Sequence, residues 1–380
     1  MLHTPLKQSQ TTIKSVDATI LDIPFRRLQR FARMEARAQT IVLVRIRDDQ
    51  NNEGIGECCV PCGPWWSGDC VESIKALIDN HLAPALIGMD AQKPIAAMVH
   101  LGRVARGASF AKAGVETALL DLLGKVLEVP ISTLLGGALR FSCPVAWPVA
   151  SGSEDSDCAE IEQKLADGQA SAFKMKLGAD TLDQDLARTA RMKDAIGGRA
   201  RLIVDPNEGW TEAQALTALP KLAEIGVDLI EQPLRRDLPA GLTRLPANLP
   251  IPVMADEGVC SESETLRLVQ MGGAQVLSLK IMKSGGITSA LSMGRIAHLG
   301  GIVPYLGTFL ESSVGSAAGL QMAAALPDLS FGGEIVGPML LAQDIVVNSI
   351  NYADGAAHVP AGPGLGVTLD EDAVRSFTRE

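Results

Sequence analysis

The sequence Ala172-Phe-Lys174-Met-Lys176 begins a series of short apolar runs that end in charged residues. The later runs end in Asp205-Pro-Asn207, Glu231-Gln-Pro233, Asp256-Glu257 and Lys280, so that successive ends lie 24 to 29 residues apart. This interval accommodates one buried strand, one covering helix and two short loops. The stretch as far as Gly286 therefore predicts repeated strand–helix units with parallel strands.

The charged ends of these runs are expected to meet at one place. Right-handed crossovers put successive parallel strands side by side, and a barrel brings every C-terminal strand end to one face. Asp205, Glu231 and Asp256 would converge there, flanked by two lysine-bearing strands. Three neighbouring acids repel one another, and a hard divalent metal with oxygen ligands removes that repulsion. Each motif alone is typical of a strand face, a turn or a helix start, whereas the ordered series indicates a functional site.

The first 139 residues have a different pattern. Residues 14–25 and 40–48 read as strands, and helical periodicity follows at 70–88, 92–106 and 109–128. Strands followed by helices are typical of an α+β unit. We therefore predict an α+β capping domain at residues 1–139 and an α/β barrel at residues 140–354. The barrel would start at Val145 and close with residues 331–336, and residues from about 355 to 380 would return to the capping domain.

Two segments of the capping domain are candidates for substrate contact. The segment Phe25–Arg37 carries arginines at positions 26, 27, 30, 33 and 37. It reads either as a solvated loop or as a mobile lid that captures an anion through bidentate contacts, with Arg30 as the central candidate. Trp65 and Trp66 lie in a loop rich in glycine and proline and are not obvious core residues, so Trp65 is a second candidate.

Composition narrows the class of partner. The chain has 380 residues and a formal net charge of −10, which argues against general binding of nucleic acid or anionic membranes. No apolar run is long enough to span a bilayer, and the N-terminus lacks the apolar core of a signal peptide. Its glycine-rich runs lack the spacing of nucleotide-binding loops. We expect a cytoplasmic enzyme that acts on a small molecule.

Together these motifs resemble the enolase superfamily, in its muconate lactonising branch. The resemblance covers nearly the whole chain and includes Lys280-Ile-Met-Lys283-Ser-Gly285-Gly286 and Glu311. It implies a capping domain on a modified (β/α)7β barrel and a homo-oligomer, often an octamer. It also implies Mg²⁺ or Mn²⁺ held by Asp205, Glu231 and Asp256, with Lys176 and Lys280 facing each other across a carboxylate substrate.

The reaction that the resemblance implies is cycloisomerisation of cis,cis-muconate to muconolactone through a metal-stabilised enolate. Lys176 would protonate the enolate, and Lys280 would hold its charge from the opposite face. Lys174, on the same strand face as Lys176, would tune its pKa, and Asn207 would support the site. Glu311 would hydrogen-bond near the metal-bound carboxylate or a lysine.

Other reactions and one other class of protein stay open. A chlorinated muconate is a close variant of the substrate. The sequence Glu311-Ser312-Ser313 also occurs in related racemases and dehydratases, so an amino-acid racemase or epimerase, or a hydroxyproline-type dehydratase, is the runner-up. A non-catalytic metal-binding scaffold is a third interpretation, but it gives no reason to keep both lysines and all three acids.

Overall fold

The N-terminal part of the chain forms a three-stranded antiparallel sheet covered by helices. The computed structural model describes residues 11–31, 34–61, 63–151, 153–238, 241–245 and 251–380. The sheet has the order β1 (Ile13–Phe31), β2 (Met34–Asp48), β3 (Glu53–Cys59). The elements that follow it are α1 (Val71–Leu77), the π-helical turn η1 (Ile78–Leu82), α2 (Ala83–Leu86), α3 (Pro94–Val104), α4 (Ser109–Val126) and α5 (Ile131–Leu134).

Helix α4 packs closely against β3, and glycines make this possible. A Cβ atom on Gly54 would lie 2.1 Å from the carbonyl oxygen of Ala118, and one on Gly56 would lie 2.0 Å from that of Gly114. Because these distances are far below van der Waals contact, only glycine allows the two backbones to approach this closely. The approach leaves most of α4 buried on all sides.

The arginine-bearing segment continues the first two strands as a long β-hairpin, so the interpretation of residues 25–37 as a loop was wrong. Gln29 pairs with Ala36 and Arg30 with Glu35. On the first strand, Ile23, Phe25 and Gln29 are buried, whereas Pro24 and Arg26 are exposed, which is the two-residue period of a half-buried strand. The charged residues of the outer face concealed this period. Arg33 and the side chain of Arg30 lie outside the described residues.

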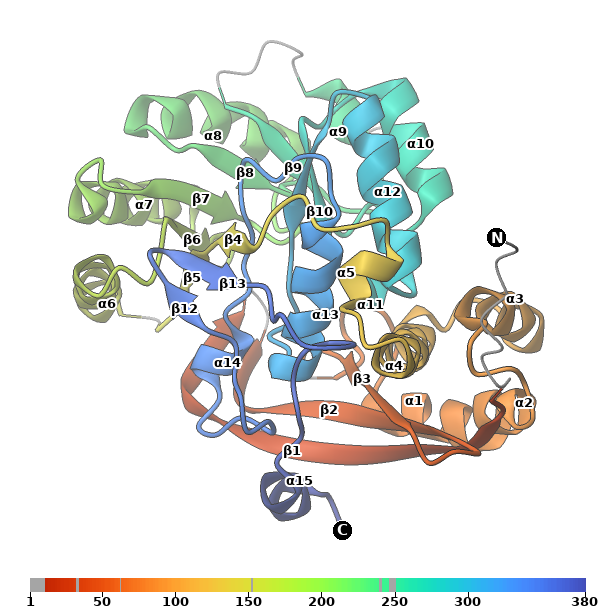
Figure 1. The fold of residues 1–380 in the computed structure, drawn as a ribbon. Coiled ribbons are helices and arrows are strands. Elements are labelled where there is room, and N and C mark those ends of the chain that lie inside the picture. The colour runs from red at the N-terminus through yellow and green to blue at the C-terminus, as the bar shows by residue number, and fades with distance from the viewer. Residues whose placement is uncertain (1–10, 32–33, 62, 152, 239–240, 246–250) are drawn as a thin grey trace, which may run out of the picture.

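The central part of the chain forms the predicted parallel barrel (Figure 1). Its strands neighbour one another in chain order: β5 (Ala146–Val149), β6 (Ala172–Lys176), β7 (Arg201–Asp205), β8 (Leu229–Glu231), β9 (Val253–Ala255), β10 (Val276–Leu279) and β11 (Val303–Leu306). Gly333 forms parallel bridges with both Leu306 and Val145. Gly333 therefore connects β11 to the residue just before β5 and closes the barrel. It belongs to the segment that was predicted to do so. A Cβ on Gly333 would lie 2.6 Å from the carbonyl oxygen of Leu306.

The interior of the barrel explains why the charged residues share one end. Each of the seven strands contributes one residue to an apolar cluster: Ala146, Ala172, Ile203, Leu229, Met254, Val276 and Tyr305. Side chains two residues apart on a strand point to the same face. Lys174, Asp205, Glu231 and Asp256 each follow a cluster residue by two positions, so they form a charged layer directly above the apolar one.

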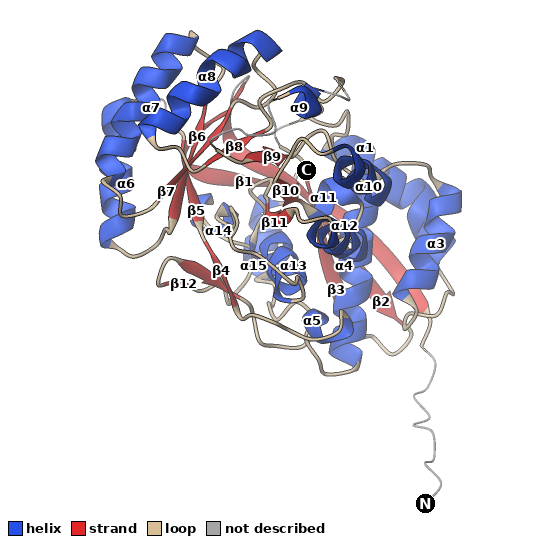
Figure 2. Ribbon diagram, turned by 90° about the horizontal axis from the view of Figure 1, so that it is seen from above, coloured by secondary structure: helices blue, strands red, loops and turns tan. Residues whose placement is uncertain are grey.

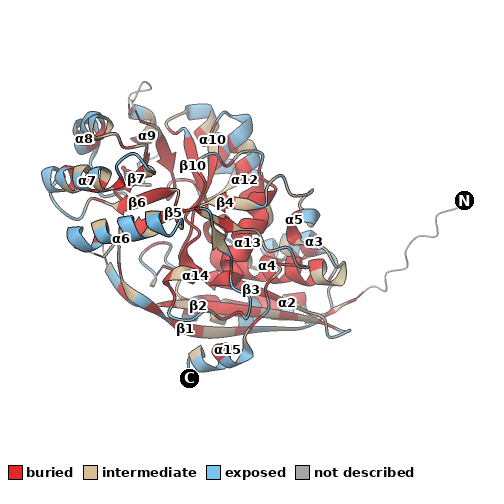
Figure 3. Ribbon diagram, turned by 60° about the vertical axis from the view of Figure 1, so that its left-hand side comes forward, coloured by how far each residue is buried: buried red, intermediate tan, exposed pale blue. Residues whose placement is uncertain are grey.

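Helices cover the barrel from outside, as Figure 2 shows for α6, α7 and α8. The helices in this part of the chain are α6 (Glu154–Ala166), α7 (Leu182–Ile196), α8 (Glu212–Ile225), α9 (Gly241–Arg244), α10 (Glu262–Met271), α11 (Ile281–Ser284), α12 (Ile287–Leu299), α13 (Ser313–Ala324) and α14 (Gly337–Leu340). Thr181 and Thr211 begin α7 and α8 with capping boxes. The outer faces of α6 to α8 are exposed, whereas α13 is buried along its whole length (Figure 3).

The end of the chain returns to the N-terminal sheet. Strand β12 (Tyr352–Ala353) pairs with β13 (Ala356–His358), which in turn pairs with β4 (Ser142–Pro144). Helix α15 (Glu371–Phe377) then lies below β1 in Figure 1, and Arg379 N donates a hydrogen bond to Ile20 O (3.0 Å). None of the helices in the described ranges is long and apolar enough to cross a membrane.

Glu57 on β3 links the N-terminal sheet to α13 and leads to a pH prediction. Burial raises its pKa to about 7, although hydrogen bonds from Ser312 and Gly315 oppose the shift. Because the folded-state pKa exceeds the unfolded value, its contribution to stability is present at acidic pH and is lost as the pH rises through about 7. Glutamine does not titrate in this range. We therefore expect the difference in Tm, Glu57→Gln minus the parent protein, to increase as the pH is raised from 5 to 8. Thermal unfolding of both proteins across this range measures the change, and a constant difference in Tm would contradict it.

Candidate active site

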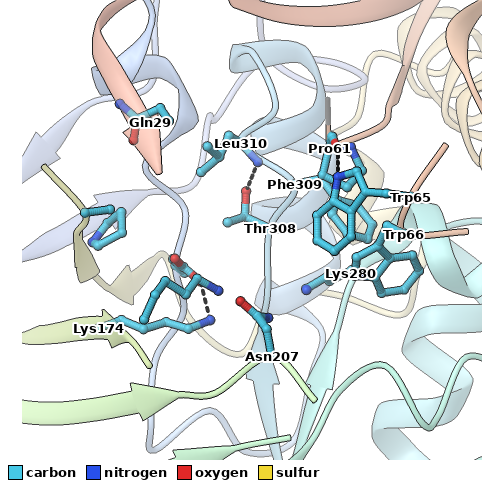
Figure 4. Close-up of a pocket in the computed structure, with 14 residues that line it drawn as sticks. Gln29, Pro61, Trp65, Trp66, Lys174, Asn207, Lys280, Thr308, Phe309 and Leu310 are labelled. Atoms are coloured by element: carbon cyan, nitrogen blue, oxygen red, sulfur yellow. Dashed lines mark hydrogen bonds and ion pairs between the residues drawn. The ribbon is translucent and has the colours of Figure 1, made fainter. Parts of the chain in front are cut away.

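A pocket lies at the C-terminal end of the barrel strands, where the barrel meets the N-terminal sheet and its loops. The sheet and the loop after β3 contribute Gln29, Pro61, Trp65 and Trp66. The barrel contributes Pro148, Ala150, Lys174, Lys176, Asn207, Lys280, Thr308, Phe309, Leu310 and Glu334. In Figure 4, Lys174 and Lys280 extend toward the pocket from opposite sides, with Asn207 between them. The structure thus brings both ends of the predicted series into one pocket.

Lys174 lies at the centre of a buried cluster of acids. Its Nζ is 2.5 Å from Glu231 Oε2 and 2.7 Å from Glu334 Oε2, and 3.4 Å from Asp205 Oδ2. Burial alone lowers the pKa of Lys174, but the carboxylates of Glu231, Glu334 and Asp205 outweigh it and raise the pKa well above its usual value. Lys174 is therefore a fixed positive charge among the acids.

Lys176 is the more accessible lysine of the same strand. Its side chain is 23% exposed, compared with 2% for Lys174, and its Nζ lies 2.5 Å from Asp205 Oδ2. Asn207 holds the same acid, because its backbone N–H donates to Asp205 Oδ1 (2.8 Å) and its side chain donates to Oδ2 (3.2 Å). Asn207 has a φ of 44°, which asparagine tolerates better than most residues.

Lys280 approaches the pocket from β10 on the opposite side. Its Nζ lies 2.5 Å from Asp256 Oδ2 and 4.7 Å from the centre of the Phe309 ring. Lys283 Nζ contacts the other oxygen of Asp256 at 2.7 Å. Burial lowers the pKa of Lys280, but Asp256 and other acids outweigh it and raise the pKa above its usual value. Lys280 is therefore held as a cation against an aromatic surface.

Gln232 explains the Glu-Gln-Pro motif. Its Oε1 accepts a hydrogen bond from Asp256 N (2.9 Å), and its Nε2 donates to Leu234 O (2.8 Å). The side chain thereby ties the end of β8 to the end of β9, which carries Asp256. Glu257 follows Asp256 and accepts a hydrogen bond from the Asn207 side chain (3.1 Å), and burial with the nearby charge of Asp256 raises its pKa to about 7.

The three predicted metal ligands are buried at neighbouring strand ends. Asp205, Glu231 and Asp256 are each fully buried, and each pairs with a lysine. Among the described residues, no three acids, histidines or cysteines already form a group that could hold a metal ion. Glu231 Oε1 nevertheless has no hydrogen-bond partner among those residues. Burial raises the pKa of Glu231 well above its usual value, and the charges of Asp205 and Asp256 add to the shift. Buried, mutually repelling carboxylates with an unpartnered oxygen fit a hard divalent cation.

Glu311 lies behind the pocket lining. The prediction placed its carboxylate beside a substrate carboxylate or a lysine. In the structure it accepts hydrogen bonds from the Thr308 hydroxyl and from Phe309 N (3.0 Å). Burial raises its pKa, against the effect of these hydrogen bonds. Its direct partners are therefore residues that line the pocket.

The two substrate-binding candidates of the capping domain differ in what the structure describes. Trp65 lines the pocket and donates its indole N–H to Pro61 O (2.6 Å). The Arg30 side chain lies outside the described residues. Arg27, three residues earlier, donates from its Nη2 to both carboxylate oxygens of Glu160 of α6, each at 3.1 Å. This pair attaches the hairpin to the barrel.

Sequence reasoning missed several residues that line or support the pocket. Glu334 is the one acid within residues 331–336, the segment predicted to close the barrel, so its position was a usable signal. Trp66 packs edge-on against Phe309, with ring centres 4.8 Å apart, and lies under the Arg236 guanidinium. Gln29 carried no signal, because it lies in the segment that was predicted to be a loop.

Comparison with known proteins gives the family of this fold and site. Residues 4–136 match the mandelate racemase / muconate lactonizing enzyme N-terminal domain, and residues 157–373 match the enolase C-terminal domain-like family. The chain is 45% identical to a chloromuconate cycloisomerase of Cupriavidus pinatubonensis, with 95% of this chain and 97% of that protein aligned. It is 42% identical to muconate cycloisomerase 1 of Pseudomonas putida, with 97% and 98% aligned.

A solved structure gives the same result. The muconate lactonizing enzyme from Pseudomonas fluorescens, complexed with muconolactone, superposes with a TM-score of 0.96 at 41% identity, covering 97% of this chain and 100% of that one. The chain therefore belongs to the enolase superfamily, and within it to the muconate lactonising branch. It is an enzyme of the isomerase class, as its cycloisomerase relatives are.

Proposed function

We propose that the chain is a muconate cycloisomerase, which converts cis,cis-muconate to muconolactone. The observation that carries this proposal is the pair of lysines, Lys176 and Lys280, that line one pocket from two separate strands above buried acids. A dianionic substrate needs positive charge around it, and the reaction needs a proton donor on one side only. This arrangement supplies both.

The bond changes of the reaction define what each lysine does. One carboxylate oxygen of the substrate adds to the diene and closes the lactone ring, and the displaced electron pair forms an enolate of the other carboxylate. Lys176 then donates a proton to the enolate α-carbon and regains one from solvent, which its partial exposure permits. Lys280 stays protonated and stabilises the developing negative charge from the opposite side.

The remaining site residues position these groups. Asp205, Glu231 and Asp256 would hold Mg²⁺ or Mn²⁺, which as a Lewis acid would stabilise negative charge on the substrate carboxylate. Lys174 and Asn207 fix the orientation of these acids through the contacts described above. Trp65 and Trp66 line the pocket, and the Trp66 ring lies beside the Lys280 ammonium.

A chlorinated muconate is the second candidate substrate. It is favoured by the 45% identity to a chloromuconate cycloisomerase, next to 42% for a muconate cycloisomerase. The chemistry at the lysines is the same for both, so the difference lies in how the pocket wall accommodates chlorine. A homo-oligomer and a cytoplasmic location remain predictions.

The test is loss of the conjugated-diene ultraviolet absorbance. We expect the purified protein with Mn²⁺ to remove this absorbance from cis,cis-muconate, and Lys176→Ala to do so far more slowly. Measuring kcat/KM for cis,cis-muconate and for a chlorinated muconate in parallel decides between the two substrates. If neither dianion loses absorbance in the presence of Mg²⁺ or Mn²⁺, the cycloisomerase proposal is wrong.

A further inference from the structure

The carboxylate of Glu57 crosses from the N-terminal sheet to the start of helix α13. It accepts hydrogen bonds from the Ser312 hydroxyl, from Ser312 N (3.1 Å) and from Gly315 N (3.0 Å). Glu57 and Ser312 are completely buried. The first backbone N–H groups of a helix have no partner within it, so a residue 255 positions away supplies acceptors for this helix end.

The surroundings of Glu57 are shaped for this contact. A Cβ atom on Gly315 would lie 2.6 Å from Glu311 Cβ and 3.2 Å from Glu57 Cδ, so glycine is required where the two acids approach α13. Gly56, the preceding residue on β3, faces α4 just as closely. Because neighbouring strand residues point to opposite sides, packing of Gly56 against α4 directs Glu57 toward α13.

Ser312 is connected to the pocket through the residue before it, Glu311. Glu311 directly precedes Ser312, and its carboxylate binds the Thr308 hydroxyl and Phe309 N. Leu310, which lies between Phe309 and Glu311 in the chain, has a φ of 65°. This left-handed conformation costs energy for leucine, so the surrounding structure must stabilise it. Thr308, Phe309 and Leu310 all line the pocket, and the Phe309 ring supports the Lys280 ammonium.

The same short loop is held from the hairpin as well. Gln39 on β2 donates its side-chain N–H to Phe309 O (2.5 Å). Gln39 is itself buried, and its side-chain N–H also contacts the sulfur of Cys59 on β3, the strand that carries Glu57. The N-terminal sheet therefore forms hydrogen bonds both with the 308–310 loop, through the carbonyl oxygen of Phe309, and with the start of the helix that follows it.

We propose that Glu57 is a positioning residue for the reaction: by capping α13 it fixes Glu311, and through Glu311 it sets the 308–310 wall of the pocket and the Phe309 surface under Lys280. The consequence for turnover rests on the proposed function, whereas the ordering of the loop does not. Misplacement of such a wall by about 1 Å can cost about 10²-fold in rate.

The experiment combines amide hydrogen exchange with kinetics. We expect Glu57→Ala to speed exchange of the amides of residues 309–315 and to lower kcat by about 10- to 100-fold. Glu57→Gln keeps one acceptor oxygen and the side-chain size, so it should recover part of both losses. If Glu57→Ala does not fold, the comparison of Glu57→Gln with the parent protein tests the same expectation with smaller effects.

Asp121 provides a matched control. It is also a buried acid of the N-terminal region, and it accepts hydrogen bonds from Ile55 N (2.8 Å) and Leu365 N (2.7 Å), neither of which belongs to the 308–310 loop. Asp121→Asn should lower Tm without changing exchange at residues 309–315. In addition, Glu57→Gln and Glu311→Gln should be non-additive in kcat, because they act through one chain of contacts.

The outcomes separate the two proposals. Unchanged exchange at residues 309–315 in a folded Glu57 variant, or the same change in Asp121→Asn, would refute a positioning role for Glu57. Additive effects with Glu311→Gln would refute the route through Glu311. If the parent protein has no cycloisomerase activity, the proposed function fails, and the exchange data still decide whether Glu57 orders the loop.

Discussion

Lys176→Ala is expected to lower kcat for cis,cis-muconate by about 10²- to 10⁴-fold, the usual effect of removing a general acid. Its side chain is 23% exposed in the pocket, whereas Lys174, two residues earlier, is 2% exposed and surrounded by acids. Only the accessible lysine can exchange its proton with solvent in each cycle. Lys176→Arg is a useful companion variant, because it keeps the positive charge beside Asp205 but is a very poor proton donor.

Lys280→Ala should also be slow, but for a different reason. It removes a cation near the developing enolate and, of the two lysines that pair with Asp256 in the described part of the chain, leaves Lys283. Residual turnover in D₂O should therefore still place deuterium on the same face of the lactone as in the parent enzyme. Stereochemical analysis of the product by NMR measures this.

A racemase would behave otherwise, because each lysine would serve one enantiomer. Exchange measured separately with each enantiomer of an amino-acid substrate tests this alternative in both lysine variants. Reciprocal loss, with one enantiomer affected in Lys176→Ala and the other in Lys280→Ala, would contradict the cycloisomerase assignment and support the runner-up.

The second large effect concerns the acids. Glu231→Gln should abolish binding of the divalent metal and lower activity by on the order of 10³-fold, since a Lewis acid supplies several kcal/mol of charge stabilisation. Glu231 is the middle of the three predicted ligands and carries the oxygen without a hydrogen-bond partner among the described residues. Metal content after dialysis against Mn²⁺, measured by elemental analysis, tests this independently of activity.

Glu334→Gln is the matched control for this experiment. Glu334 also pairs with Lys174, at 2.7 Å, but it lies outside the predicted ligand set. The variant should therefore retain bound Mn²⁺, whatever its effect on turnover. Equal metal content in Glu231→Gln and the parent protein, or equal loss in both variants, would show that the ligands are not the three predicted acids.

Local patterns in the sequence were enough to predict the barrel and the charged series. Buried parallel strands are continuous apolar runs, and the helices between them impose a nearly regular interval, so the strand ends at Lys176, Asp205, Glu231 and Asp256 could be read directly. The alternation of side chains along a strand also predicted that Lys174 and Lys176 share a face. These features depend on residues close together in the chain.

Tertiary structure alone decided the features that join distant residues. The pairing of Lys174 with Glu334 spans 160 residues and depends on closure of the barrel at Gly333. The segment around Arg30 forms a β-hairpin because one of its faces packs on the rest of the protein. The charged residues on its other face concealed this strand pattern in the sequence. Likewise, Glu57 meets Ser312 only because glycines bring β3 against α4. A sequence pattern reports the environment of a strand or helix, whereas these contacts arise from how separate elements pack together.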